Sequence, residues 1–271
     1  MSSRADKSYQ LGKFQNNEEE LSRLKNQASI ILDLEFEHLS GAGLKKGMRV
    51  MDMGCGPGII SSEIIYRSNP TYFIAADCNE TSLNEARAHF NSKGLDHRQI
   101  RKSNIYDKNM DLNLSFDFIY SRLLFQHLSN PLMALENVKN WLAPEGRFCI
   151  CDVDDRWINI SPDSDAFQTL KARSSTSQRK RGGDRQVGIK LPEYFSRAGF
   201  EDIQTSCLLL STQILGKEKF SEIVLGYMVS ASQEEDASAA RNELLSIREQ
   251  LFSDHGWGAI AVFFVSGKNP N

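Results

Sequence analysis

The sequence predicts an α/β fold in which helices cover both faces of a parallel sheet. Apolar, strand-like segments alternate with helical segments through residue 153. Such alternation requires parallel pairing through right-handed crossovers. A glycine-rich loop follows the first of these strands, as in strand–loop–helix units that bind a ligand. The 271 residues are enough for one large domain, or for one domain with an inserted cap.

The expected elements follow from hydrophobic periodicity and from turn residues. A helix is predicted over residues 17–40, ending at Gly41-Ala42-Gly43. Strands are predicted near 48–53, 72–77, 99–103, 116–120 and 147–153, with helices near 59–67, 82–91 and 131–141. The alternation then stops at a polar segment, 161–190. Regular elements return as a helix over 191–198, a strand near 203–210, helices around 217–230 and 237–252, and a last strand near 259–266.

Composition excludes several functional classes. The net charge is -3 and the pI is about 6.0, so the general basic field of a nucleic-acid-binding protein is missing. No apolar run reaches the ~18 residues that span a bilayer, and the polar N-terminus lacks a signal-peptide core. We therefore expect a cytoplasmic protein. The five cysteines show no C-x-x-C spacing, which favours reduced thiols over disulfides or a metal site.

The most informative motif is the loop Asp52-Met53-Gly54-Cys55-Gly56-Pro57-Gly58, which lies between a predicted strand and a predicted helix. Its glycines allow a tight turn and a close approach of ligand to backbone. The helix that follows directs unpaired N–H groups towards an anionic group. The alternative is a tight turn that binds nothing.

Two further residues bear on the ligand. A dinucleotide fingerprint would place Gly or Ala at position 59, where this chain has Ile59. Asp77 lies at the tip of the next strand, about 20 residues further on, where a carboxylate can accept both hydroxyls of a ribose. Asp77 suits a dinucleotide equally well, so Ile59 is the residue that argues against a nicotinamide-dependent oxidoreductase.

The loop with its strand, Val50 to Gly58, resembles motif I of the class I S-adenosylmethionine-dependent methyltransferases. Weaker similarities follow in the order expected for that family. They are Phe116–Arg122 with Gln126-His127-Leu128, Leu142–Arg147 with Glu145 in place of a glycine, Gly188–Pro192, and Ala198-Gly199-Phe200. Tyr9–Gly12, followed by Glu20 and Arg23-Leu24, resembles the N-terminal cap of the branch that methylates small molecules.

The resemblance implies a Rossmann-like, doubly wound, seven-stranded sheet whose last strand is antiparallel. It also implies S-adenosyl-L-methionine as cofactor, S-adenosyl-L-homocysteine as product, and a small-molecule methyl acceptor. Asp77 would bind the ribose, Cys78 the adenine face, and Asn104 and Ile105 the adenine edge, although the family often has Asp at position 104. Ser121 would approach the methionyl end through its backbone. The remaining implied cofactor contacts are Tyr9, Arg23, Asp52, Gly54, Cys55 and Gly56.

No catalytic residue is assigned, because a sulfonium-bound methyl group is already activated and a base is needed only if the acceptor must lose a proton. The candidates for such a base are His127, Asp152 and Asp154, with Asp155 beside them. A helix-capping or core role is the alternative for the histidine, and a solvated loop or a cap is the alternative for the acids.

Seven basic residues and one acid lie within 171–190. This segment is either a solvated loop or a lid for an anionic acceptor. We divide the chain into an N-terminal cap and helix, 1–40, and a methyltransferase domain, 41–271. We expect the first 16 residues to close over the cofactor through Tyr9. The methyltransferase domain has an acceptor-side insertion at about 155–190 and a helical insertion at about 217–252. The alternatives are an RNA or protein methyltransferase and a non-catalytic cofactor-binding protein. No membrane or nucleic-acid partner is expected, and the oligomeric state stays open.

Overall fold

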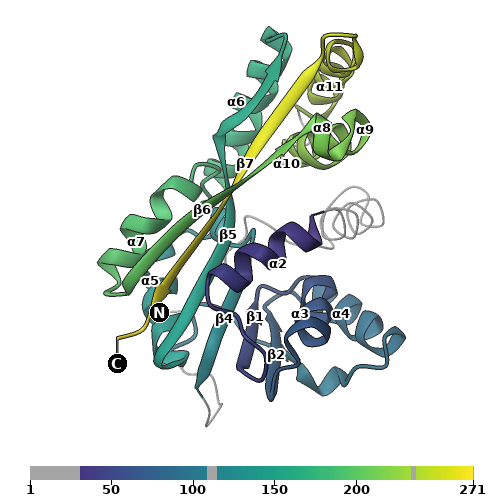
Figure 1. Cartoon of the computed structure of the whole chain (residues 1–271). Helices are drawn as coiled ribbons and strands as arrows, with labels where there is room; N and C mark the ends of the chain where they lie inside the picture. The colour runs from purple at the N-terminus through teal and green to yellow at the C-terminus, as the bar shows by residue number, and fades with distance from the viewer. Residues whose placement is uncertain (1–30, 109–114, 233–235, 271) are drawn as a thin grey trace.

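The computed structural model describes residues 31–108, 115–232 and 236–270. One seven-stranded sheet has the order β3-β2-β1-β4-β5-β7-β6 (Figure 1). The pairs β1–β2, β1–β4, β2–β3 and β4–β5 are parallel, whereas β7 is antiparallel to both β5 and β6. The doubly wound sheet with an antiparallel last strand is therefore confirmed. The strand order reverses between β1 and β4, which is where open α/β sheets form a ligand crevice.

The first half of the sheet follows the predicted elements closely. It comprises β1 (Arg49–Met53), α3 (Ile59–Ser68), β2 (Tyr72–Asp77), α4 (Glu80–Ser92), the short helix η1 (His97–Gln99) and β3 (Ile100–Lys102). The Asn79 side chain caps α4 by accepting a hydrogen bond from the Ser82 N–H at 2.9 Å. A capping side chain of this kind satisfies one of the unpaired donors of the first turn.

The next unit contains β4 (Phe116–Arg122), the short helix η2 (Phe125–His127), α5 (Pro131–Trp141) and β5 (Leu142–Ser161). The sequence predicted that β5 would end at residue 153, and this was wrong. Beyond an irregularity between Val153 and Ile158, the strand continues to pair with β7, with Ile158 opposite Ile260. The charged residues in the irregularity hide this continuation from a search for uniform apolar runs.

The remaining elements are η3 (Gly188–Lys190), α7 (Leu191–Arg197), β6 (Glu201–Ser211), α8 (Thr212–Leu215), α9 (Lys217–Phe220), the π-helical turn η4 (Ser221–Leu225), α10 (Gly226–Ala231), α11 (Ala237–Phe252) and β7 (Trp257–Lys268). Before them lies α6 (Asp165–Lys180), in the polar segment where no regular element was predicted. Ser164 caps α6, and its Phe167 and Leu170 are buried. A few apolar residues at helical spacing were therefore enough to anchor this helix.

Helices cover both faces of the sheet. In Figure 1, α2 (Leu32–Gly41), α3 and α4 lie on one side, and α5 and α7 lie on the other. Successive residues of β1 serve the two layers, since Val50 packs with Phe73 on one face and Met51 with Ile74 on the other. Only part of the helix predicted over 17–40 lies in the described residues, where it begins at Leu32 and ends at Gly41.

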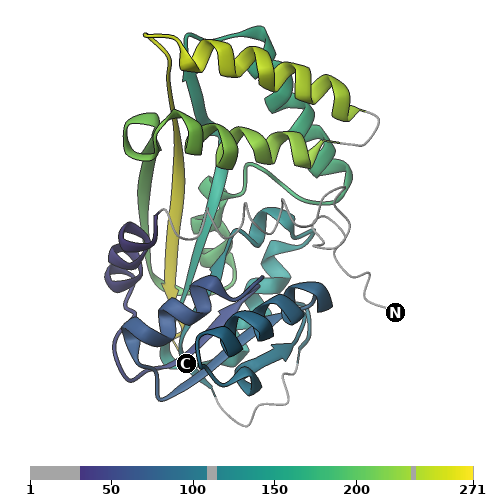
Figure 2. The same cartoon turned by 90° about the vertical axis from the view of Figure 1, so that its right-hand side faces the viewer.

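The long strands β5, β6 and β7 extend past the shorter strands (Figures 1 and 2). Their far ends carry α6 and the group α8 to α11 (Figure 2). The salt bridge between Arg173 of α6 and Glu243 of α11, at 2.8 Å, joins two of these helices. The described parts of the two expected insertions therefore contribute to one helical group. The division of the chain into cap, domain and insertions stays a prediction.

Candidate active site

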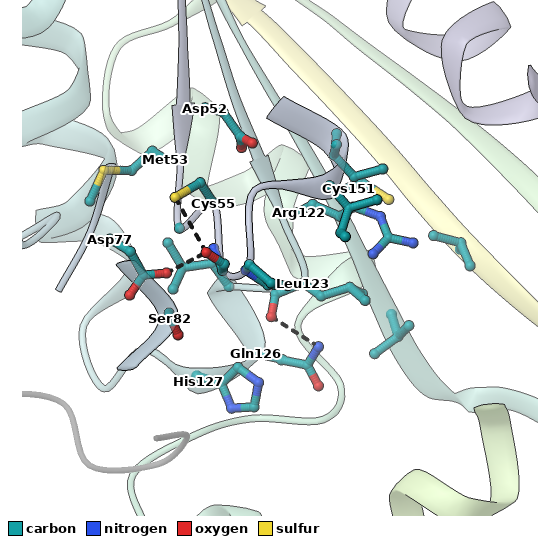
Figure 3. Close-up of a pocket in the computed structure, with 18 of the residues that line it drawn as sticks. Asp52, Met53, Cys55, Asp77, Ser82, Arg122, Leu123, Gln126, His127 and Cys151 are labelled. Atoms are coloured by element: carbon teal, nitrogen blue, oxygen red, sulfur yellow. Dashed lines mark hydrogen bonds between the residues drawn. The ribbon is translucent and has the colours of Figure 1, made fainter. Parts of the chain in front are cut away.

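A single cavity begins at the carboxyl ends of β1, β2 and β4 and continues beneath the helical group. Figure 3 shows the side chains of Asp52, Cys55, Asp77, Leu123 and His127 around it. This position is the topological switch point of the sheet, where the loops that follow adjacent parallel strands separate. The cavity is therefore lined by segments that lie far apart in the sequence.

The glycine loop forms one wall in a conformation that L side chains rarely adopt. Gly54, Gly56 and Gly58 have φ angles of 80°, 53° and 76°. A Cβ atom at Gly54 would lie 3.0 Å from Leu124 Cδ2, whereas a Cβ atom at Gly56 would meet nothing within 4 Å. The first glycine is thus required by packing, and the second keeps open a space beside the backbone that a ligand can fill.

Asp77 ties the tip of β2 to this loop. Its carboxylate accepts hydrogen bonds from the Gly56 N–H at 3.0 Å and from the Asn79 N–H at 2.8 Å (Figure 3). Burial raises the pKa of Asp77, and the backbone donors partly oppose that rise. The side chain also lines the cavity. It is therefore held in place and remains available to a hydroxyl-bearing ligand.

Cys78, Asn104 and Ile105 line the same cavity next to Asp77, and Cys78 is exposed. Asn104 Oδ1 already accepts a hydrogen bond from the Tyr106 N–H at 3.0 Å. A carbonyl-type oxygen has a second lone pair, so this contact leaves acceptor capacity for a ligand.

Asp52 is buried at the end of β1, where it also lines the cavity. Ser61 Oγ donates a hydrogen bond to Asp52 Oδ2 at 2.5 Å. Burial raises the pKa of Asp52 to about 7, against the effect of the Ser61 hydrogen bond, and the negative charges of Glu35 and Asp77 add to the rise. A cationic ligand beside Asp52 would favour its ionised form.

The end of β4 meets the cavity one to three residues later than predicted. Ser121 is fully buried and is not among the lining residues, whereas Arg122, Leu123 and Leu124 are. Leu123 has a φ angle of 53°, an unusual conformation for a non-glycine residue that is typical of functional sites. Its N–H donates to the Cys151 carbonyl at 2.7 Å, and its carbonyl accepts from Gln126 Nε2 at 3.3 Å (Figure 3).

Arg122 belongs to a buried network that the sequence did not reveal. Its Nε donates to Glu35 Oε2 at 2.9 Å, and the Tyr120 hydroxyl donates to Glu35 Oε1 at 2.6 Å. Although burial alone would lower it, the charge of Glu35 raises the pKa of Arg122. The available signal was an acid on the apolar face of the predicted N-terminal helix. The network fixes α2 against β4 beside the cavity.

His127 lines the cavity and is a neighbour of Gln178. Gln178 Nε2 lies 2.7 Å from His127 Nδ1 and 3.0 Å from the Gln126 carbonyl, and Gln178 Oε1 accepts from Arg181. The carbonyl can only accept and the guanidinium can only donate, so the orientation of the amide is determined. Gln178 therefore donates to Nδ1, and a neutral His127 carries its proton on Nε2. This tautomer presents a donor at Nε2 rather than a base.

Asp152, Asp154 and Asp155, which lie within β5, do not line the cavity. Asp152 accepts hydrogen bonds from the Gln126 and Val153 N–H groups, at 3.0 and 2.8 Å, and burial raises its pKa to about 7. Asp154 pairs with Arg156 at 2.6 Å. Asp155 forms a buried pair with Arg185, also at 2.6 Å. The structure thus gives these carboxylates structural partners, and the prediction of a solvated loop was wrong because all three are buried.

The expectation of a solvated loop was wrong for residues 171–180, which belong to α6. Several basic residues of 171–190 make contacts within the chain, which gives the alternative of a lid for an anionic acceptor no support. Lys171 donates to the Ile158 carbonyl at 2.9 Å, and Lys190 pairs with Asp184 at 2.6 Å. Arg173 pairs with Asp236 as well as with Glu243. Arg185 is buried and lines the cavity. Tyr9 and Arg23, with the expected lid, lie outside the described residues.

Comparison with known proteins identifies the class that this fold and cavity define. A model of the methyltransferase domain matches residues 44–206, and the chain belongs to this methyltransferase family. Ubiquinone biosynthesis O-methyltransferases of Neisseria meningitidis and Dinoroseobacter shibae are 27% and 30% identical over 42% and 47% of this chain. The matches span 47% and 48% of those relatives, about half of their length.

The structure is also similar to that of phosphoethanolamine N-methyltransferase 2 of Haemonchus contortus, solved with S-adenosylhomocysteine. The TM-score is 0.55 at 19% identity, over 88% of this chain and 53% of that one. This similarity supports the fold. Within the described residues, no helix is long and apolar enough to cross a membrane, and no cluster of three metal-ligating side chains occurs.

Proposed function

We propose that this chain transfers a methyl group from S-adenosyl-L-methionine to a small-molecule acceptor. The main support for this proposal is that the glycine loop, Asp77 and the end of β4 line the same cavity. Family membership supports the same reaction. The expectation of a cytoplasmic enzyme rests on the sequence alone and stays a prediction.

The donor set of the cavity fits this cofactor. The open space beside Gly56 would hold the part of S-adenosylmethionine that contacts the protein backbone. Gly54, Cys55 and Asp52 would surround its methionyl end. Asp77 would accept the ribose hydroxyls, while Cys78, Asn104 and Ile105 would border the adenine. Arg122, Leu123 and Leu124, which line the cavity, would contact the methionyl end in place of Ser121.

S-adenosyl-L-methionine supplies a methyl group already activated by its sulfonium. The residues of the chain need to bind and orient the two reactants and to exclude water. The buried side chains near Leu123 that line the cavity would keep water away from the reacting groups. His127, held as the Nε2–H tautomer, would orient an acceptor oxygen by donating to it. No base is assigned.

The chain offers a matched pair of variants to test the cofactor site. Gly56 and Gly94 both have positive φ, 53° and 68°, and a Cβ atom at either meets nothing within 4 Å. Only Gly56 lines the cavity. Both Gly56→Ala and Gly94→Ala should cost about 1–2 kcal/mol of unfolding free energy, the usual cost of this conformation for an L residue. Only Gly56→Ala should weaken S-adenosylhomocysteine binding by calorimetry, about tenfold or more.

The proposal fails if a folded Gly56→Ala protein binds S-adenosylhomocysteine as tightly as the Gly94→Ala protein does. It also fails if the unaltered protein binds neither S-adenosylmethionine nor its product.

A further inference from the structure

The cavity continues past Leu123 into a part that we call the apolar chamber. Its walls come from β6, β7, α8 and η4, and the side chains are Leu210, Leu215, Ile223, Val224, Ile260 and Val262. All six are buried. The strands β6 and β7 and the helical group therefore together build a largely hydrocarbon surface in the cavity. Sites with such linings bind small molecules through apolar contact.

The two arginines that line the cavity, Arg122 and Arg185, already have counter-charges within the chain. Arg122 is paired with Glu35 at 2.9 Å, and Arg185 with Asp155 at 2.6 Å, and both carboxylates are buried. Arg185 also donates to Gln126 Oε1 and lies over the Tyr227 ring, with 4.4 Å from the guanidinium carbon to the ring centroid. An anionic ligand could therefore pair with Arg122 or Arg185 only by displacing Glu35 or Asp155, and the displaced carboxylate would be left buried and unpaired.

The polar helix α6 does not restore a charge to the chamber. Its Lys171 and Arg173 contact the Ile158 carbonyl and the acids Glu243 and Asp236, and neither residue lines the cavity. Asp52 and Asp77, the acids that line the cavity, belong to the glycine-loop end. An ionised acceptor would therefore lose its hydration at the chamber without gaining an unpaired counter-charge from the part of the chain that the structure describes, which is costly.

We propose that the apolar chamber binds the methyl acceptor, and that this acceptor is an uncharged and predominantly apolar molecule. The proposal rests on the proposed function for the presence of an acceptor. The area of hydrocarbon wall provides the affinity, and the internal pairing of Arg122 and Arg185 provides the discrimination against ions.

Two dyes with one skeleton test the charge preference. Phenylnaphthylamine is uncharged, and anilinonaphthalene sulfonate is the same molecule with a permanent negative charge. Each is titrated into the full chain saturated with S-adenosylhomocysteine, and binding is measured from the rise in dye fluorescence. We expect saturable binding of the uncharged dye, with an affinity at least about tenfold above that of the sulfonate. Equal or tighter binding of the sulfonate would overturn the proposal.

Neighbouring residues of β6 provide a control for the location. Leu210 lines the chamber and is 6% exposed, whereas Leu209 points away and is 55% exposed. Leu210→Gln should weaken binding of the uncharged dye about tenfold, while Leu209→Gln should leave it unchanged. Val224→Phe fills the chamber and should weaken binding of the uncharged dye as Leu210→Gln does. With two chamber variants, the test remains valid if one of them fails to fold.

S-adenosylhomocysteine affinity is measured for each variant by calorimetry and should stay within about threefold of the unaltered protein. If the chamber variants still bind S-adenosylhomocysteine and none of them changes the dye affinity, the chamber proposal is contradicted. The proposed function is then unaffected. Failure of the unaltered protein to bind S-adenosylhomocysteine contradicts the proposed function itself.

Discussion

His127 shows how a neighbour determines what a titratable residue can do. The Gln178 amide donates to Nδ1 because its other contacts, with the Gln126 carbonyl and with Arg181, leave it no other orientation. A ring whose Nδ1 accepts must carry its proton on Nε2 when neutral. His127 lines the cavity, but the hydrogen-bond partner that limits its chemistry lies 51 residues away in the chain.

The tautomer of His127 is directly measurable. Long-range nitrogen NMR spectroscopy at neutral pH should show His127 with a protonated Nε2 and an unprotonated Nδ1. Its signal is identified by its loss in His127→Gln. Replacing Gln178 with Leu removes the donor and should shift the ring towards a mixture of the two tautomers. A protonated Nδ1 in the unaltered protein would refute this assignment and return His127 to the candidates for a general base.

Other residues separate into those that local sequence determines and those that distant contacts determine. Gly54, Gly56 and Asp77 were predictable because a strand–loop–helix unit fixes their positions within one stretch of chain. Ser121 does not line the cavity, because the turn at Leu123, with its positive φ, continues the cavity wall beyond the strand end. Asp152 and Asp154 were misjudged because their partners cannot be recognised from the sequence beside them.

Among the elements, α2 depends most on a single buried contact. Glu35 is fully buried between Tyr120 and Arg122, so its removal leaves a buried arginine without its counter-charge. Glu35→Ala should therefore lower the free energy of unfolding by about 3–5 kcal/mol. Tyr120→Phe, which removes one hydrogen bond, should lower it by about 1 kcal/mol. Urea denaturation followed by circular dichroism measures both.

A control is available in the exposed pair of Glu193 and Arg197, whose side chains are 67% and 56% exposed. Glu193→Ala should change the free energy of unfolding by less than about 1 kcal/mol. If Glu35→Ala destabilises the protein no more than this control does, Glu35 does not anchor α2.

Element boundaries were predictable wherever one periodicity persisted. The strands β1, β2 and β4 consist mostly of buried residues, and their bounds lie close to the predicted ones. The extension of β5 and the helix α6 were missed because each depends on tertiary contacts. β5 continues only because β7 lies beside it, and α6 packs with α11, which follows it by more than 50 residues.

For the whole molecule, the order of strands and helices gave the fold class, and the glycine loop gave the cofactor end of the cavity. The apolar chamber could not be foreseen, because its side chains come from β6, β7, α8 and η4 and meet only after the sheet has formed. The pairing of the basic residues in 171–190 could not be predicted from the sequence either. The basic segment suggested an anionic acceptor until Arg173 and Arg185 proved to be paired within the chain.

We infer that the cavity accommodates S-adenosylmethionine rather than a dinucleotide. Calorimetric titration of the full chain with S-adenosylhomocysteine, and separately with NAD, tests it most directly. The glycine loop with Ile59, the open space beside Gly56 and the position of Asp77 predict one molecule of S-adenosylhomocysteine bound per chain and no heat of binding from NAD. Binding of NAD without any response to S-adenosylhomocysteine would contradict the account.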